Sequence, residues 1–498
     1  MGFRFYNSYT KRLEDFKPLV PGEVKIYSCG PTVYDFAHIG NFRSYVFSDI
    51  LRRSLKLGGY SVHHAMNITD VDDKTIKRTI DQKADPDKED LKRYTETFTK
   101  SFFEDIEKIG IEPFDVFPRA TDYMDVMISL VKRLEEKNLA YRLDGSVYFP
   151  ISRYENYGKL SGVDLSSVKS GTRYNADEYT KEDVRDFVLW KSEKEREKIA
   201  WDSPFGRGRP GWHLECSAMI HSIFKGPIDI HTGGVDLMFP HHENEIAQSV
   251  NAYEHDFVRY WMHCEHLLVD SRKMSKSEGN FYTLRDLIEK GYHPYAVRYF
   301  LLSSHYSQKI NFTTDALDQI ASTLRRINNF YRRLSQVQWT SACSTNSKSE
   351  SGKKTEEKIR KEQALLEAIP AWKSEFLANL EDDLNTPRAL AVLHNAIKYC
   401  NGFLDESGDT LTQIGKHALD EIFYEFNSVF NIISDELADS EIGDNAPEEI
   451  LELLARRNQA RKEKNYAVSD KIRDEIHRAG YVIVDTPEGG RLQKKLSS

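Results

Sequence analysis

The sequence has no apolar run of the roughly 20 residues that a membrane-spanning helix requires. It also begins without an apolar leader: residues 1–16 read MGFRFYNSYTKRLEDF, and Tyr6 breaks the Met-Gly-x-x-x-Ser/Thr pattern of N-terminal acylation. A hydrophobic fraction of 40% beside 30% charged residues is typical of a soluble globular protein. We therefore expect a cytoplasmic protein with no membrane partner.

Cysteine is scarce, and positive charge is not in excess. The five cysteines are an odd number at distant positions, which does not fit a secreted disulfide framework and leaves thiols or metal ligands. They are Cys29, Cys216, Cys264, Cys343 and Cys400. The formal net charge of −9 argues against nonspecific coating of nucleic acid but leaves a local basic surface open.

A length of 498 residues predicts about three or four domains. Two sets of strand and helix patterns lie far apart in it. The first has strands over 24–29 and 60–69 around a helix from about 43 to 56; the second has a strand over 226–234, a helix from His241 to about 253 and a strand over 265–270. We expect both sets to form one parallel sheet, interrupted by an insertion over 115–209.

The second half of the chain reads as helices and linkers. Residues 336–358 are rich in Ser, Thr and Lys and predict a flexible loop, whereas 359–433 show helical periodicity and 434–449 form an acidic linker. The expected boundaries are 1–114 and 210–310 for the two halves of the sheet domain, 115–209 for the insertion, 311–433 for a helical bundle, 434–449 for the linker and 450–498 for a small C-terminal unit.

Two short motifs have the composition of a phosphate site, although each alone has an ordinary explanation. CGPTVYDFAHIGN leaves a strand and enters a helix, so His38 and Asn41 lie near a helix N-terminus, where donors and the helix dipole favour phosphate. By itself it reads as a common strand-to-helix turn. KMSKSEGN places Lys273 and Lys276 in one loop, which by itself reads as a solvated basic turn.

A third pattern suggests a metal. His241 and Glu245 are four residues apart at the start of a helix, so they face the same way and could share one ion. A lone pair of this kind is more often a surface pair. Adding Cys29 and Cys216 gives two thiolates, an imidazole and a carboxylate, a set that suits zinc. We expect these ligands to converge from the ends of three strands on a cleft.

The two short motifs together resemble the HIGH and KMSKS signatures of class I aminoacyl-tRNA synthetases. The resemblance implies that His38, Gly40 and Asn41 bind ATP, accompanied by Mg²⁺, and that Lys273 and Lys276 stabilise the phosphate as pyrophosphate leaves. Asn41 departs from the final histidine of the signature, and it can donate a hydrogen bond but carries no charge. The implied fold is a Rossmann-type α/β catalytic domain with a split parallel sheet.

Longer blocks resemble cysteinyl-tRNA synthetases. They are YSCGPTVYDFAHIGN, NITDVDDK, FVLWK, WDSPFGRGRPGWHLECSAM, GGVDLMFPHHENEIAQS and KMSKSEGN, and they span most of the first 310 residues. The resemblance implies one zinc per chain on Cys29, Cys216, His241 and Glu245, which takes the thiolate of the substrate cysteine as a further ligand. It also implies a cysteine pocket lined by Gly30, Thr69, Trp212 and Asp236. The role of His242 stays open, and Cys264, Cys343 and Cys400 read as inert thiols.

The C-terminal half carries a weaker resemblance. DDLNTPRALAVLHNAIK, residues 382–398, resembles the helical DALR-type domain of this family. The last unit resembles an anticodon-binding unit and carries a basic set that suits phosphate, although a solvated helix could look the same: Arg456, Arg457, Arg461, Lys462, Lys464, Lys471 and Arg473. Its end reads GGRLQKK where the family has Thr-x-Trp, so no anticodon-reading residues are assigned.

The leading hypothesis is an enzyme that activates L-cysteine with ATP and transfers it to tRNA(Cys), acting as a monomer. Two alternatives remain. A ligase relative passes the same adenylate to an amino sugar, but such relatives lack the terminal unit. A noncatalytic tRNA-binding paralogue would be expected to have lost the lysine loop or the zinc set. Because the metal selects cysteine at the first binding step, we expect no hydrolytic editing domain, and an insertion that is structural or tRNA-facing.

Overall fold

The computed structural model describes residues 2–163, 173–174, 186–193, 198–275, 279–340, 350–434, 437, 447–463, 465–486 and 489–494. The chain divides into two compact units. The first unit comprises Met1–Phe281, Ser304–Asn311 and Leu380–Asn385, and the second comprises Tyr282–Ser303, Phe312–Asn379 and Thr386–Ser498. In the part of the chain that the structure describes, no helix is long and apolar enough to cross a membrane.

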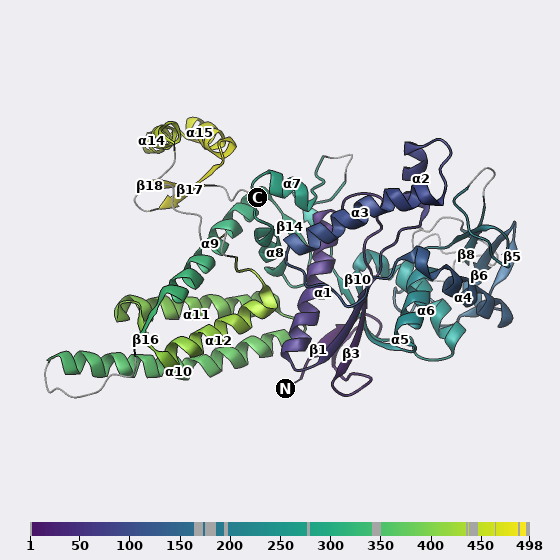
Figure 1. Ribbon diagram of the computed structural model, residues 1–498, viewed down its shortest axis with the longest axis horizontal. Coiled ribbons are helices and arrows are strands. Elements are labelled where there is room, and N and C mark those ends of the chain that lie inside the picture. Colours follow the sequence, from purple (N-terminus) through teal and green to yellow (C-terminus); the bar gives the residue numbers. More distant parts are fainter. Residues whose placement is uncertain are drawn as a thin grey trace. The chain divides into compact units, whose positions relative to one another are not determined.

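The first unit is built on a parallel sheet that joins the two halves expected from the sequence (Figure 1). Its strands are β3 (Glu23–Ser28), β4 (Ser61–Met66), β10 (Ile228–Gly234) and β11 (Val258–Cys264), in the order β11-β10-β3-β4. All three pairings are parallel. Since β10 pairs with β3 across some 200 residues of sequence, the prediction of one sheet interrupted by an insertion is confirmed.

Helices cover both faces of this sheet. Alternate residues of β3 enter different cores: Ile26 packs in a cluster that also holds Leu51 of α1 (Ile39–Leu57), whereas Tyr27 packs in the cluster of α5 (Leu214–Phe224) and α6 (His241–Tyr253). The arrangement is that of a doubly wound α/β fold.

One strand expected from the sequence is wrong. The fourth strand of the sheet is β11, Val258–Cys264, and not the run 265–270. Within that run β12 (Leu267–Val269) belongs to a second sheet of order β13-β12-β14, with β13 (Arg272–Lys273) and β14 (Ile310–Phe312). Asp270 and Ser271 have positive φ, which makes the tight turn between β12 and β13. The aliphatic residues of 265–270 therefore form a hairpin strand instead of extending the core sheet.

The insertion forms a β-layer of its own. It contains η1 (Ala120–Tyr123), α4 (Met124–Glu136), β5 (Tyr141–Leu143), β6 (Ser146–Phe149), η2 (Ile151–Arg153), β7 (Arg173–Tyr174), β8 (Asp186–Ser192) and β9 (Gly208–Pro210). The strand order is β5-β6-β8-β7, and β9 pairs with β8. The buried carboxylate of Glu243 in α6 accepts the amide hydrogens of Gly158 and Ser161, both at 2.8 Å, which fixes the insertion to the helix that carries His241.

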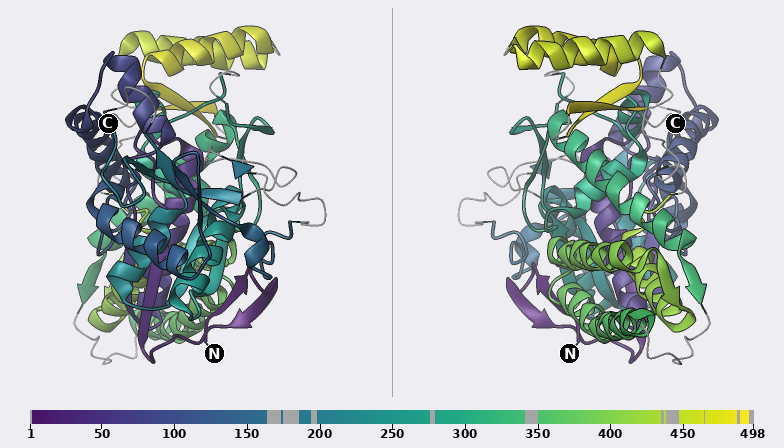
Figure 2. Two further views of the ribbon diagram at one scale, coloured as in Figure 1. Left: turned by 90° about the vertical axis from the view of Figure 1, so that its right-hand side faces the viewer. Right: turned by 90° about the vertical axis from the view of Figure 1, so that its left-hand side faces the viewer.

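The remaining elements of the first unit are β1 (Arg4–Asn7), β2 (Arg12–Asp15), α2 (Asp73–Gln82), α3 (Lys88–Lys108) and η3 (Val235–Met238). The hairpin β1-β2 lies near the N-terminus in both views of Figure 2. Side-chain oxygens cap both long helices at their starts, because Asp72 accepts from the Thr75 amide and Asp87 from the Asp90 amide. The start of α2 is therefore held firmly, which matters because it borders the cavity described below.

The second unit is mainly helical. It contains α7 (Leu284–Glu289), α8 (Pro294–Leu302), α9 (Thr314–Gln336), β15 (Gln338–Thr340), α10 (Glu350–Glu381), α11 (Thr386–Ser407), β16 (Thr410–Thr412) and α12 (Gln413–Phe430). The helical expectation for 359–433 is confirmed. The loop expected over 336–358 is shorter in the structure, since β15 and α10 enter it from both ends, and residues 341–349, with Cys343, lie outside the described residues.

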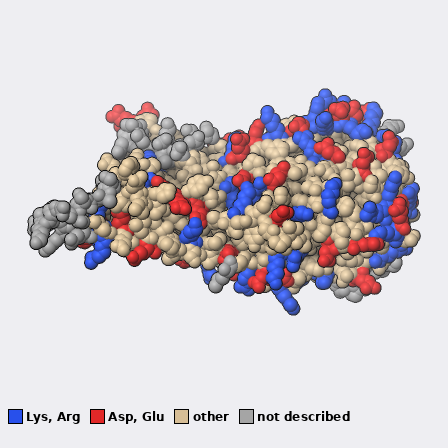
Figure 3. Space-filling view, turned by 60° about the horizontal axis from the view of Figure 1, so that its bottom comes forward, with Lys and Arg blue, Asp and Glu red and all other residues tan. Residues whose placement is uncertain are grey.

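The C-terminal part has helices α14 (Glu448–Lys462) and α15 (Tyr466–Arg478), followed by the antiparallel hairpin β17 (Tyr481–Thr486) and β18 (Gly489–Lys494). Ile476 of α15 and Leu492 of β18 share its small core. The expected acidic linker lies largely outside the described residues. Figure 3 shows both Lys and Arg and Asp and Glu on the face that it displays.

Candidate functional site

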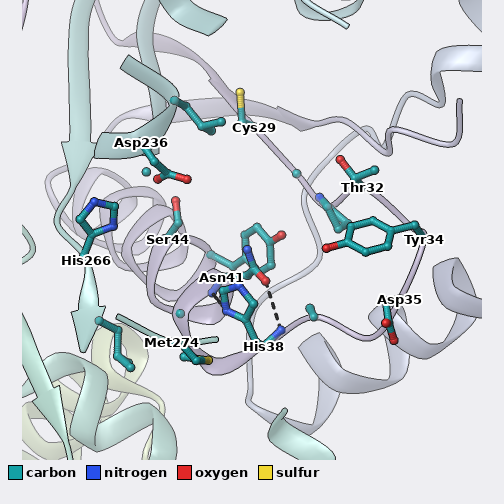
Figure 4. A pocket seen from close by; sticks show the side chains of 18 of the residues that line it. Cys29, Thr32, Tyr34, Asp35, His38, Asn41, Ser44, Asp236, His266 and Met274 are labelled. Carbon is teal, nitrogen blue, oxygen red and sulfur yellow. Dashed lines mark hydrogen bonds between the residues drawn. The ribbon is translucent and has the colours of Figure 1, made fainter. Parts of the chain in front are cut away.

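A cavity of about 480 Å³ lies in the first unit, at the carboxyl ends of the parallel strands. Cys29 and Gly30 follow β3 directly, Asp236 follows β10, and Cys264 ends β11. This edge of an open α/β sheet is where ligands bind in doubly wound folds. Figure 4 shows Cys29 and Asp236 at one side of the cavity, His38, Asn41 and Met274 at another, and Thr32, Tyr34 and Asp35 along a third. The wall thus offers three chemically different regions.

The structure brings together the four residues selected as metal ligands. One donor atom from each of Cys29, Cys216, His241 and Glu245 lies within 4.8 Å of the others, and all four residues are buried. Sγ of Cys216 lies 3.5 Å from Nε2 of His241, which lies 2.9 Å from Oε1 of Glu245. The expectation that these ligands converge from the ends of three strands is wrong: Cys29 directly follows β3, but Cys216 lies in α5, and His241 and Glu245 lie in α6.

The chemistry of these donors fits a divalent zinc ion. Burial raises the pKa of the Cys29 and Cys216 thiols, so a bound cation is needed to hold them as thiolates near neutral pH. Burial would also raise the pKa of Glu245, but His231 and His241 bring it down to about 2. Oε1 of Glu245 is buried and lies 2.9 Å from Nε2 of His241, which is another of the four candidate ligands. Two sulfurs, one nitrogen and one carboxylate oxygen are ligands that zinc prefers.

Further histidines surround this cluster. His231 and His242, with Cys29 and Glu245, form a second group whose donor atoms lie within 4.8 Å of one another. Nε2 of His242 lies 3.3 Å from Sγ of Cys29, and Nε2 of His231 lies 3.0 Å from Oε2 of Glu245. Burial lowers the pKa of His242, so the ring is neutral near pH 7. His242 therefore helps to fix the position of Cys29, and His231 that of Glu245.

The sequence interpretation left His242 open and missed His231. His231 occupies an interior position of β10, and a histidine between strand residues could have signalled a polar partner. That the partner is Glu245 could not be read from the sequence, because it depends on how α6 lies against β10. His242 is joined through Nδ1 to Nε2 of His263 at 2.8 Å, and His263 belongs to the neighbouring strand β11.

Of the four residues predicted to bind cysteine, three line the cavity. Gly30 must be glycine, since a Cβ there would lie 1.8 Å from the carbonyl oxygen of Asn67. The ring of Trp212 stacks on that of His241 with centroids 4.3 Å apart, and Asp236 follows β10 in η3. Thr69 is buried behind the wall, where its hydroxyl donates to Glu215 at 2.8 Å.

The opposite side of the cavity holds the start of α1. His38 is the N-cap: its Nδ1 accepts the amide hydrogen of Asn41 at 3.2 Å, and its own amide donates to Oδ1 of Asn41 at 3.1 Å, the bond drawn in Figure 4. Gly40 leaves room for this ring, since a Cβ there would lie 2.9 Å from it. Asn41, which replaces the histidine of the signature, therefore completes a capping box. Lys273 lines the cavity, and Lys276 lies outside the described residues.

Comparisons with known proteins agree with this geometry. Residues 15–322 match the family model described as "tRNA synthetases class I (C) catalytic domain", 375–433 match "DALR domain", and 444–493 match "Cysteinyl-tRNA ligase anticodon binding domain". The chain is 46% identical to a protein from Leptospira interrogans and 43% to one from Brachyspira hyodysenteriae, both named cysteine–tRNA ligase, with 99% of each chain covered.

Solved structures share the fold. Methionyl-tRNA synthetase of Mycobacterium tuberculosis, bound by methionyl-adenylate, aligns with a TM-score of 0.57 at 15% identity, covering 84% of this chain and 90% of that one. A putative arginyl-tRNA synthetase of Campylobacter jejuni aligns with a TM-score of 0.53 at 14% identity, covering 82% and 92%. The fold, together with the family match over residues 15–322, is that of a class I aminoacyl-tRNA synthetase. Within that class, the full-length relatives and the matched domains show that the chain belongs to the cysteinyl-tRNA synthetase family.

Proposed function

We propose that the chain activates L-cysteine with ATP, forming cysteinyl-adenylate and pyrophosphate, and transfers the cysteine to tRNA(Cys). One observation carries the proposal: the buried cluster of Cys29, Cys216, His241 and Glu245 reaches, through Cys29, the same cavity that the capped N-terminus of α1 lines. A thiol-binding group and a phosphate-binding group on one cavity are what cysteine activation requires. We expect the protein to act as a cytoplasmic monomer.

The nucleotide would lie along the side of the cavity formed by His38, Gly40 and Asn41. The N-terminus of α1 presents backbone donors and the positive end of its dipole to phosphate. Lys273, on the same wall, and Lys276, in the loop that follows, supply cations for the charge that develops as pyrophosphate leaves, together with Mg²⁺. These groups bind and orient the triphosphate, and their effect is largest in the transition state.

Cysteine would lie between Asp236, whose carboxylate suits the α-ammonium, and Trp212, whose ring closes the pocket over His241. Gly30 leaves room beside Cys29, and Thr69 supports the wall through Glu215. Zinc held by the four ligands would supply a coordination position for the substrate thiolate that the hydroxyl of serine fills poorly. Size alone separates such a pair by only about 1 to 3 kcal/mol.

The C-terminal domains favour tRNA over an amino sugar as the acceptor. The match over 444–493 is to an anticodon-binding model. Of the basic residues predicted from the sequence, α14 carries Arg456, Arg457, Arg461 and Lys462, α15 carries Lys471 and Arg473, and Lys464 lies outside the described residues. We propose the domain boundaries predicted from the sequence as the organisation of the chain. Because zinc would reject serine at the binding step, a hydrolytic editing domain is unnecessary.

The test is cysteine-dependent exchange of pyrophosphate into ATP. Wild type should catalyse exchange with cysteine and not with serine, and Lys276→Ala should slow it by on the order of 10² to 10³ while cysteine still binds. Exchange that does not depend on cysteine, or that survives Lys276→Ala unchanged, would sink the assignment.

A further inference from the structure

The third region of the cavity wall takes no part in the proposed binding of ATP or cysteine. It is formed by the loop that carries Tyr34, Asp35 and Phe36 and by the start of α2, with Asp72, Asp73 and Lys74. The side chain of Phe36 is 39% exposed, a high value for a phenylalanine on a cavity wall. Cysteine and ATP are accommodated by the other two regions, whereas the proposed reaction has a third substrate.

Phe36 is held in place by other aromatic rings. Phe98 of α3 contacts it edge to face with centroids 5.2 Å apart, and Tyr94 lies 5.2 Å from Phe98. The hydroxyl of Tyr94 donates to the carbonyl oxygen of Tyr34 at 2.7 Å, which fixes the loop from α3. The amide of Phe36 donates to Oδ1 of Asp35 at 2.9 Å. The ring is therefore a supported, partly exposed platform and not a loose surface side chain.

Cations border the same platform. Lys74 and Arg78 are four residues apart on α2 and so lie on one face of it. Nζ of Lys74 lies 5.7 Å from the centre of the Tyr34 ring, and Arg78 lies 3.7 Å from Asp35. The carboxylate of Asp73 on this wall is matched by two buried cations, Lys191 at 2.7 Å and Arg209 at 3.0 Å. The negative charge of Asp73 is thus compensated, while Asp72 caps α2 by accepting the amide hydrogen of Thr75.

An exposed aromatic ring flanked by cations is the composition that proteins use for single-stranded nucleic acid, because bases stack on the ring while the cations meet the backbone. We propose that Phe36 is the stacking platform for one base of the single-stranded 3′ end of tRNA, and that Lys74 and Arg78 meet its phosphates. The inference rests on the proposed transfer of cysteine to tRNA. This position puts the acceptor end of tRNA at the third cavity region, apart from the regions proposed for ATP and for cysteine.

The experiment compares two half-reactions in Phe36→Ala, Phe36→Tyr and Tyr6→Ala. Tyr6 is a matched control, since it is 40% exposed in the same unit and does not line the cavity. Loss of one base–aromatic stack should lower kcat/KM for tRNA aminoacylation about 5- to 150-fold in Phe36→Ala. Cysteine-dependent exchange, which needs no tRNA, should keep the wild-type rate. Phe36→Tyr should restore aminoacylation, and Tyr6→Ala should leave both reactions unchanged.

A second arm identifies the base. The same variants are assayed with tRNA that lacks one base at each of the last three positions in turn. At one of these positions Phe36→Ala should cause no additional loss, because the stack is already absent. Equal loss of exchange and aminoacylation in Phe36→Ala would show that the platform serves ATP and would overturn the inference. It would also be overturned if Phe36→Ala lowered aminoacylation of each of the three abasic tRNAs as much as that of intact tRNA. Failure of exchange in wild type would instead refute the proposed function itself.

Discussion

Replacing Asp73 by asparagine should destabilise the first unit by about 2 to 3 kcal/mol. Asp73 is the shared partner of Lys191 on β8 and Arg209 on β9, whose side chains are only 8% and 6% exposed. Removing one member of a buried ion pair costs about 3 to 5 kcal/mol, because the remaining charge is left buried and unpaired. Asp73 itself is 42% exposed, so water screens part of the interaction and the lower estimate applies.

The assay is urea denaturation followed by tryptophan fluorescence, since the fully buried Trp190 adjoins Lys191 in the sequence. Asp85→Asn is the matched control, because Asp85 pairs with Lys198 where both side chains are 59% exposed, and its midpoint should not move. Adding Lys191→Met to Asp73→Asn should recover part of the loss, because one of the two cations that have lost the Asp73 carboxylate is then gone. Equal midpoints for the Asp73 and Asp85 variants would refute the reasoning.

The pH dependence follows from the same contacts. Burial would raise the pKa of Asp73, but Lys191 and then Arg209 lower it below its usual value. A carboxyl group whose pKa is depressed on folding adds stability that is fully present above its unfolded pKa, about 3.9, and is lost as the pH falls through the folded pKa. The difference in unfolding free energy between wild type and Asp73→Asn should therefore be constant near neutral pH and should shrink below about pH 4. A difference that stays the same in acid would contradict this reasoning.

Three further predictions concern the other parts of the chain. Asn41→Ala should lower the free energy of unfolding by about 0.3 to 1.5 kcal/mol in thermal denaturation, because the capping box is lost. Asn41→Gln keeps an acceptor and should be destabilised less, so equal destabilisation of the two variants would argue against the cap. Truncation after Ile433 should spare cysteine-dependent exchange and cripple aminoacylation, whereas equal loss of both in a folded protein would count against a separate tRNA-binding part. Zinc binding near pH 8 should release about three protons, two from the thiols and one from His241. Burial would lower the pKa of that imidazole, but Glu245 and Cys216 outweigh it and raise the pKa to about 10. Calorimetry in buffers of different ionisation heat measures the number of protons, and release of none would exclude thiolate ligation.

The sequence predicted those features that depend on local pattern or on distinctive chemistry. The helix beginning at His241 was placed with its observed bounds, since its apolar spacing and its position after a glycine-rich strand are local signals. Cys29, Cys216, His241 and Glu245 could be grouped because few residue types bind zinc. Asn41 could be recognised as a departure, but its function as a helix cap required the observed bonds to His38.

Other features depend on tertiary placement. The run 265–270 looked like the fourth core strand because it is aliphatic, while β11, which takes that position, carries polar His263 among its buried residues. That histidine has a partner, His242, only because β11 lies beside β10 and next to α6. Thr69 was assigned to the cysteine pocket, and its place behind the wall follows from its bond to Glu215, a contact across 146 positions that no local pattern could predict.

The central claim is that a metal held by Cys29, Cys216, His241 and Glu245 recognises the thiolate of cysteine. X-ray absorption spectroscopy at the zinc edge of the purified protein measures this most directly. We predict about one zinc per chain with two sulfur ligands at about 2.3 Å, a third sulfur on addition of cysteine, and no change on addition of serine. Cys216→Ser should lose one sulfur from each spectrum. A protein that holds no zinc yet still selects cysteine over serine, or a sulfur count that cysteine does not change, would contradict the account.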